Sequence, residues 1–356
     1  MKKTGLIALL IVILIVIGGC LNVEINAGNN ASSNASISAG GDKVHFIDVG
    51  QGDSVLVESN GEYMLVDAGE ENMGDVVVDY LNKLGVEYIK YIVATHPHSD
   101  HIGGMDDVIN NFKVENIIMP DVTTNTRSFE NMLDAVENNN VNAIKSEAGN
   151  SFTLGNFECN ILGPLTISED MNNNSVVIKL VCGDDKILLT GDCSKNEEYE
   201  ILDSGADLSA DLLKTGHHGS STSNTEKFIK SVNPSAAVIS CGKNNDYGHP
   251  HKDVVTLFNK LGIEMYRTDE LGTVVAECKE NGIEISSNGV TDIIDENNGN
   301  NVNSEDNVYI LNTKSKKYHR IYCGSIKSIK NKEEYNGSAD ELKSMGYSPC
   351  GNCKPE

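Results

Sequence analysis

Three histidines and one aspartate lie within six residues of the chain, at His96, His98, Asp100 and His101. Imidazole and carboxylate groups together suit zinc, manganese or iron better than calcium. A continuous α-helix would point these side chains in different directions, whereas a loop can wrap them around one point. The spacing therefore predicts a loop that binds divalent metal ions, zinc or manganese.

A buried strand is expected to carry this loop, because residues 89–94 just before it form an apolar run. Other polar groups follow short apolar runs and have a glycine close by. These groups are Asp67, Asp192, the pair His217 and His218, and His249. A sheet opens onto a site where its strands end, so these side chains are expected to gather near the histidine loop.

The remaining elements follow from hydrophobic periodicity. Strands are expected at residues 44–49, 54–57, 63–66, 116–119, 157–162, 175–182, 186–190, 236–240, 273–278 and 283–286. Helices are expected at residues 73–84, 128–137, 224–231 and 252–261. This order predicts an α/β fold in which two sheets form a sandwich with helices outside.

The composition limits the possible partners. The chain has 356 residues, a formal net charge of −24 and no tryptophan. Such an acidic surface repels nucleic acid phosphates unless metal ions or a local basic patch compensate. The small number of aromatic residues argues against a stacking platform for single-stranded nucleic acid.

The N-terminus has the pattern of an export signal. Lys2 and Lys3 precede an apolar run at residues 6–17, and Cys20 follows Ile17-Gly18-Gly19. This pattern predicts a signal peptide at residues 1–20 and lipidation of Cys20. An uncleaved anchor helix at residues 5–21 is the alternative. In both cases residues 21–41 form a flexible tether, and the rest of the chain is extracytoplasmic and anchored to the cell membrane.

The histidine loop and the later polar groups resemble the metal centre of the metallo-β-lactamase superfamily, over residues 42–290. The resemblance implies an αββα sandwich with the metal site at one edge. The ligands it implies are His96 and His98 for one ion, Asp100, His101 and His249 for a second, and Asp192 as a bridge between the two. Asp67 would orient the loop through hydrogen bonds.

One feature departs from the superfamily pattern. A further histidine usually lies between the histidine loop and the bridging aspartate, but this chain has none between His101 and His217. Either water or His217 completes the first site, or that site is weakly held or empty. The departure leaves open whether one or two metal ions are bound.

A narrower resemblance is to the extracytoplasmic metallo-hydrolase domain of ComEC competence proteins. It is carried by residues 46–54 (FIDVGQGDS), 173–177 (NNSVV) and 216–220 (GHHGS). It implies that Asp48, Asn174 and Ser175 support the site. In the expected chemistry Asp100 orients a metal-activated hydroxide, and His217 or His218 protonates the leaving oxygen.

The C-terminal part differs in character from the rest. Residues 291–306 are polar and Asn-rich, which predicts a linker, and residues 307–356 have an excess of basic side chains. The expected ligands of a structural zinc ion there are His319, Cys323, Cys350 and Cys353. A Cys350–Cys353 disulfide is the alternative. The region resembles the Ada-type metal-binding domain, although that domain normally uses four cysteines, and its basic character is suited to DNA.

Three functions are compatible with these patterns. The leading hypothesis is a membrane-anchored, extracytoplasmic metal-dependent hydrolase of phosphoester bonds in DNA or nucleotides. The same site on another substrate would make it a hydrolase of phosphocholine-type esters, lactones or thioesters. The third hypothesis is a surface DNA-binding protein whose metal is structural. The sequence identifies no protein partner.

Overall fold

The computed structural model describes residues 41–287, 308–320, 326 and 329–350. The predicted signal peptide, the lipidation site at Cys20, nearly all of the tether and the linker lie outside these residues. Within the described part of the chain, no helix is long and apolar enough to cross a membrane.

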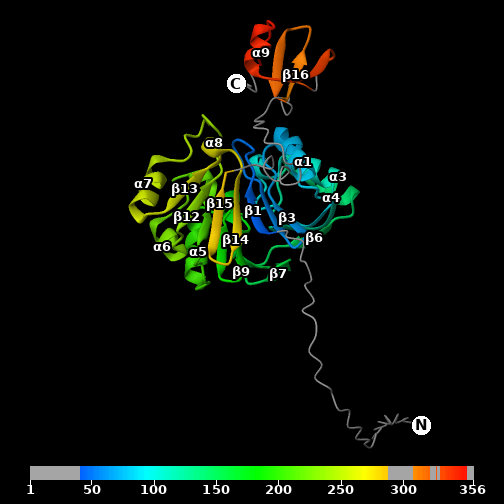
Figure 1. The fold of residues 1–356 in the computed structure, drawn as a ribbon. Helices are drawn as coiled ribbons and strands as arrows, with labels where there is room; N and C mark the ends of the chain where they lie inside the picture. The colour runs from blue at the N-terminus through cyan, green and yellow to red at the C-terminus, as the bar shows by residue number, and fades with distance from the viewer. Residues whose placement is uncertain (1–40, 288–307, 321–325, 327–328, 351–356) are drawn as a thin grey trace, which may run out of the picture. The chain divides into compact units, whose positions relative to one another are not determined.

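Two mixed sheets form the body of the protein (Figure 1). The eight-stranded sheet has the order β15 (Gly282–Ser286), β14 (Val274–Lys279), β1 (Asp42–Phe46), β2 (Val55–Ser59), β3 (Glu62–Val66), β4 (Tyr88–Val93), β5 (Lys113–Met119) and β6 (Asn142–Lys145). The seven-stranded sheet has the order β13 (Glu264–Arg267), β12 (Ala236–Ile239), β11 (Leu212–Lys214), β10 (Asp185–Leu189), β9 (Val177–Cys182), β8 (Phe157–Gly163) and β7 (Ser151–Leu154).

Helices cover the outer face of each sheet (Figure 1). The eight-stranded sheet packs against α1 (Gly74–Lys83), α3 (Met105–Asn111) and α4 (Arg127–Asn138) through one apolar cluster. The seven-stranded sheet packs against α5 (Lys195–Ser204), α6 (Glu226–Val232) and α7 (Lys252–Leu261) through another. A third cluster, which includes Phe46, Met64, Phe157 and Leu180, fills the space between the sheets. These layers confirm the expected αββα sandwich.

Every strand and helix expected from the sequence is present, but several short elements were not expected. They are α2 (Ser99–Ile102), α3, α5, α8 (Thr268–Leu271), β6, β7, β11 and β13. α5 has a physical explanation, because two of its buried residues are the carboxylic acids Glu197 and Glu198. Buried polar residues on the inner face erase the apolar periodicity by which a helix is recognised.

The C-terminal residues form a small sheet with its own core. Its order is β18 (Lys332–Asn336), β16 (Val308–Asn312), β17 (Lys317–Arg320) and β19 (Ser348–Pro349). Tyr309, Leu311, Tyr318, Leu342 and Tyr347 are buried together. Helix α9 (Ala339–Ser344) begins with a capping box formed by Ser338 and Glu341.

Candidate metal centre

The predicted site residues come from strands that end at one edge of the sandwich. β3 and β4 are parallel neighbours, as are β10, β11 and β12, so their carboxyl ends point the same way within each sheet. Asp67 comes after β3, the histidine loop after β4, Asp192 after β10, the pair His217 and His218 after β11, and His249 after β12. Carboxyl ends of parallel strands are a common place for ligand sites.

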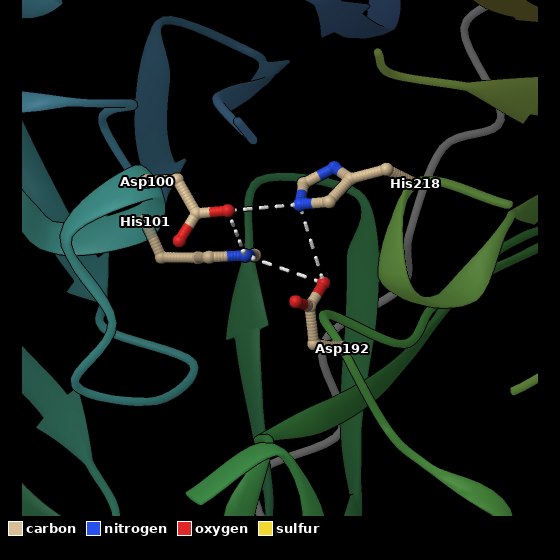
Figure 2. A group of neighbouring side chains, drawn as sticks. All are labelled: Asp100, His101, Asp192 and His218. Carbon is tan, nitrogen blue, oxygen red and sulfur yellow. Dashed lines mark hydrogen bonds and ion pairs between the residues drawn. The ribbon is translucent and has the colours of Figure 1, made fainter. Parts of the chain in front are cut away.

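Figure 2 shows four of these side chains, Asp100, His101, Asp192 and His218, pointing toward one another. Their ligand atoms all lie within 4.8 Å of one another. His218 Nε2 lies 3.1 Å from Asp100 Oδ2, and His101 Nε2 lies 3.2 Å from Asp192 Oδ1. Asp100 and His101 are in the short helix α2 rather than in an irregular loop. Two imidazoles and two carboxylates are a suitable donor set for zinc or manganese.

A second cluster shares Asp192 with the first. His96 Nε2 lies 3.0 Å from His98 Nδ1 and 3.8 Å from Asp192 Oδ2. His217 Nε2 approaches the same Asp192 oxygen at 3.6 Å. His217 is therefore close enough to complete this cluster, in place of the additional histidine that the sequence lacks between His101 and His217. Asp192 presents one carboxylate oxygen to each cluster, as a bridging ligand would.

Hydrogen bonds behind the histidines orient them. His101 Nδ1 donates to Asp67 Oδ2 over 2.7 Å, which leaves Nε2 to face the cluster. Thr95 Oγ1 donates to the same carboxylate oxygen at 2.7 Å and accepts from His96 Nδ1 at 3.2 Å. Asp67 thus fixes a ring in each cluster, as expected from the sequence. Such partners set both the tautomer and the direction of a metal-binding imidazole.

His218 is held by groups that the sequence analysis did not identify. Its Nδ1 donates to the carbonyl oxygen of Ser240 at 3.0 Å and lies 3.3 Å from Asp53 Oδ1. The other Asp53 oxygen pairs with Lys214 Nζ at 2.8 Å, and both side chains are buried. The sequence did contain one sign of this buried ion pair, because Lys214 stands at the end of the short apolar run before Gly216.

The buried polar atoms support the presence of a metal ion. His101 Nε2 and Asp192 Oδ1 are both inaccessible to solvent, and apart from their mutual approach at 3.2 Å neither has a hydrogen-bond partner among the described residues. Buried polar atoms in proteins nearly always have a partner. A divalent ion between them would satisfy both, so the residues fit the metal that the fold implies.

Electrostatics point the same way. Burial disfavours the charged form of Asp192, but His101 and His218 outweigh this and hold the pKa of its carboxyl well below its usual range. Burial likewise disfavours a charged His218, but Asp192 and Asp53 raise its pKa to about 10. In the metal-free protein, protons on the imidazoles therefore balance the carboxylates. A divalent cation would take their place.

The backbone at the histidine pair is unusual. His217 and His218 have φ values of 50° and 54°, in the left-handed region that side chains other than glycine rarely adopt. Asn224 secures this turn, because its side chain accepts from Gly216 N and donates to the carbonyls of Gly216 and Ser220. Glu198 of α5 in turn accepts from the backbone nitrogen of Asn224. The turn directs both imidazoles toward Asp192.

A pocket of about 370 Å³ opens beside the clusters. It is lined by ligand candidates from both clusters and by neutral polar groups that include Gln51, Thr126 and Asn172. Among the described residues, no lysine or arginine lines it. With the imidazoles engaged as ligands, metal ions would therefore supply the positive charge that attracts an anionic substrate.

Two predicted residues are placed differently from expectation. From the sequence, His249 was assigned to the same ion as Asp100 and His101. It is not in the cluster that these two residues form, and its ring centroid lies 6.0 Å from that of His218. His218 takes its place because the left-handed turn aims both adjacent imidazoles inward. Asp48 is exposed and accepts a hydrogen bond from Gly50 N, so it supports the turn before Asp53 and does not contact a ligand.

The other two supporting residues are near the site. Ser175 Oγ accepts from the backbone nitrogen of Asp192 at 3.1 Å, which fixes the bridging residue. Asn174 is buried, and its side chain holds the preceding loop through Ser168. Of the C-terminal zinc candidates, His319 and Cys350 are both buried, while Cys323 and Cys353 lie outside the described residues.

Fold and site together define a protein of the metal-dependent hydrolase type, and the sequence comparison names the family. A family model described as "Metallo-beta-lactamase superfamily" matches residues 47–243. The chain belongs to this superfamily.

Its relatives include competence proteins. ComE operon protein 3 of Bacillus subtilis is 31% identical over 251 residues, which cover 65% of this chain and 32% of the relative. Competence protein ComA of Neisseria gonorrhoeae is 31% identical over 230 residues, which cover 64% and 31%. Recombination protein 2 of Haemophilus influenzae is 28% identical over 253 residues, which cover 68% and 30%. The chain thus matches about a third of the length of these relatives.

Solved structures give weaker matches. The metallo-beta-lactamase fold protein YhfI from Bacillus subtilis is 14% identical with a TM-score of 0.45, over 63% of this chain and 96% of that one.

Proposed function

We propose that the protein is a phosphodiesterase that acts on DNA or nucleotides. The observation that carries the proposal is the pair of donor clusters that share Asp192. Two adjacent cations suit a phosphodiester, because they can stabilise both the attacking and the leaving oxygen. The similarity to proteins named for competence and recombination supports DNA as the source of the ester.

The residues would divide the work as follows. His96, His98 and His217 would hold one ion, and the second would be held by Asp100, His101 and His218, with Asp192 between them. Divalent metal ions in such a site supply a Lewis acid for the ester oxygen and a water of lowered pKa. As ligands, His217 and His218 would have no proton on Nε2 to give to the leaving oxygen. This assignment replaces the acid role expected for them from the sequence.

His249 is the imidazole that remains for the substrate. Burial and the neighbouring His218 lower its pKa to about 4, so its ring is neutral at physiological pH. Its Nδ1 lies 3.4 Å from the Gln51 side chain, which orients the ring. A neutral imidazole at this place would hydrogen bond to the substrate and carry no positive charge.

Hydrolysis of methyl p-nitrophenyl phosphate by the purified chain tests the proposal. With zinc or manganese we expect turnover that a chelator abolishes. His98→Ala should reduce it about a hundredfold or more, because the loss of an outer-shell partner alone costs about 10–100-fold. Lys227→Met, at an exposed site, serves as the control. Protein that holds two metal ions per chain yet hydrolyses no phosphodiester would exclude the proposal.

The proposed location is outside the cytoplasmic membrane, through lipid on Cys20. The signal pattern in the sequence supports this location. Cys20→Ala should move the protein out of the membrane fraction of its host. An unchanged distribution would favour the anchor helix.

The C-terminal unit is proposed to hold a structural zinc ion. β17 and β19 are parallel neighbours, with Tyr318 opposite Pro349. Cys350 directly follows β19, and its backbone nitrogen donates to the Tyr318 carbonyl, so the backbone brings Cys350 close to His319 of β17. His319→Ala should remove one zinc ion per chain and leave hydrolysis unchanged. A zinc content equal to that of the wild type would contradict this assignment.

A further inference from the structure

An aromatic side chain stands at the rim of the metal pocket. Tyr247 lines this pocket and is 67% exposed, more than any other large hydrophobic side chain in the described part of the chain. Its ring lies parallel to that of His249, with centroids 5.6 Å apart and an interplanar angle of 17°. His249 therefore covers one face of the tyrosine, and the high exposure leaves the other available.

The histidine on which this ring stacks has a fixed place relative to the metal-ligand candidates. His249 is held by Asn245, which accepts from its backbone nitrogen at 2.9 Å and donates to its carbonyl at 2.7 Å. The His249 ring centroid lies 5.6 Å from that of His217 and 6.0 Å from that of His218. Tyr247 is thus one ring beyond the imidazoles that face Asp192. A group attached to a phosphate at the metal centre would come within reach of the tyrosine.

The chemistry of the pocket favours a nucleobase as that group. Among the described residues, its lining offers amides, hydroxyls, imidazoles and the Tyr247 ring but no lysine or arginine. The chain as a whole carries a charge of −24, so long-range attraction to a nucleic acid backbone is weak. Stacking on an aromatic ring accepts any base and requires no positive charge. The overall scarcity of aromatic residues does not exclude this, because one ring is enough for one base.

We propose that Tyr247 binds, by stacking, the nucleobase of the nucleotide whose phosphate is hydrolysed. The inference rests on the proposed phosphodiesterase activity and narrows its substrates to nucleotidyl esters. Tyr247 determines specificity and takes no part in the bond cleavage itself.

Two substrates with the same leaving group test this role in the metal-loaded chain. Thymidine 5′-(p-nitrophenyl phosphate) carries a base, and methyl p-nitrophenyl phosphate carries none. We expect Tyr247→Ala to raise KM for the thymidine ester about tenfold, with kcat changed little and the methyl ester unaffected. Tyr247→Phe keeps the ring and should behave like the wild type. An equal effect of Tyr247→Ala on both esters, or no effect on either, would overturn the proposal.

A binding measurement separates this inference from the proposed activity. Calorimetry measures the binding of thymidine 5′-monophosphate and of methyl phosphate to the wild type and to Tyr247→Ala. The variant should bind the nucleotide more weakly than the wild type does and methyl phosphate equally well. If the wild type hydrolyses neither ester, the activity proposal fails, and this comparison alone decides the role of Tyr247. Unchanged nucleotide affinity in a variant with wild-type metal content and thermal stability would reject that role. A thymidine dinucleotide and a longer oligothymidylate then distinguish free nucleotides from DNA strands as the source of the base.

Discussion

At the scale of single residues, the centre depends on how each imidazole is directed. His101, His96 and His218 each have one ring nitrogen engaged by a protein group, so the other faces Asp192 or its neighbours. Five of the six ligands proposed from the sequence lie in the two clusters. The sixth, His249, lies outside them, because the positive φ values of His217 and His218 turn the His218 imidazole into the place expected for His249. Histidines with positive φ are too rare to be expected from residue types.

Replacing His218 and His249 separately tests this difference. His218→Ala should remove one metal ion per chain, because the cluster of Asp100, His101, Asp192 and His218 loses one of its two imidazoles. His249→Ala should retain both ions and affect only substrate binding. Metal analysis of the dialysed proteins measures the outcome, and loss of an ion from His249→Ala alone would restore the assignment made from the sequence.

Metal binding at the cluster that contains His101 and His218 should strengthen as the pH rises. Burial disfavours the protonated forms, but nearby carboxylates still raise the pKa of His218 to about 10 and that of His101 above its usual value. Both imidazoles therefore hold protons at neutral pH, and a cation must displace them, so affinity falls as the pH is lowered. Calorimetry in buffers of different ionisation enthalpy should report about two protons released per ion. Release of none would contradict the direction of these shifts.

At the scale of elements, two connections of the eight-stranded sheet, the turn before β2 and helix α2 after β4, make a tight backbone contact beside the site. Gly52 has a φ of +146°, and a Cβ there would come 2.5 Å from the carbonyl oxygen of Asp100. Asp53 N donates to the same oxygen at 3.0 Å. The turn before β2 thus packs directly on helix α2, which carries Asp100 and His101.

Gly52→Ala should therefore lower both stability and metal affinity. We expect a loss of about 1–3 kcal/mol in the free energy of unfolding from backbone strain, together with a shift of Asp100. Gly183→Ala is the matched control, because Gly183 also has a positive φ but open space around it, and it should cost about 1 kcal/mol. Urea unfolding and zinc titration measure both effects. Equal losses in the two variants, with unchanged zinc affinity, would refute the close contact.

Element prediction succeeded where burial was one-sided and failed where it was not. α7 was expected at residues 252–261 and occupies Lys252–Leu261, since its apolar face is regular. α5 was missed because Glu197 and Glu198 face inward, and Glu198 serves the histidine turn. The edge strands β7 and β13 were missed because each has only four residues, too few to establish a period. Residues that support the site from neighbouring elements leave no local pattern in the sequence.

At the scale of the whole molecule, a buried ion pair joins the two sheets beneath the metal centre. Lys214 ends β11 of the seven-stranded sheet, and Asp53 precedes β2 of the eight-stranded sheet. The neighbouring Lys214 and His218 outweigh the effect of burial and hold the pKa of Asp53 near 2. The Asp53 carboxyl therefore stays ionised across the physiological range. Removing one partner would leave an uncompensated charge in the interior.

Lys214→Met should destabilise the metal-free protein by about 3–5 kcal/mol. Lys227→Met breaks an exposed pair with Asp203 and should cost less than about 1 kcal/mol. Adding Asp53→Asn to Lys214→Met should recover much of the loss, because the amide oxygen can still accept from His218. Urea unfolding of the three variants gives the comparison. A Lys214→Met variant as stable as the wild type would show that the pair does not hold the sheets together.

The proposed centre holds two metal ions that share Asp192, with one histidine of the adjacent pair on each. A crystal structure of the manganese-loaded chain, with anomalous scattering to locate the metal, would show both ions and their ligands. We expect two anomalous peaks, one among His96, His98, His217 and Asp192, and the other among Asp100, His101, His218 and Asp192. A single peak, or a peak ligated by His249 instead of His218, would contradict it.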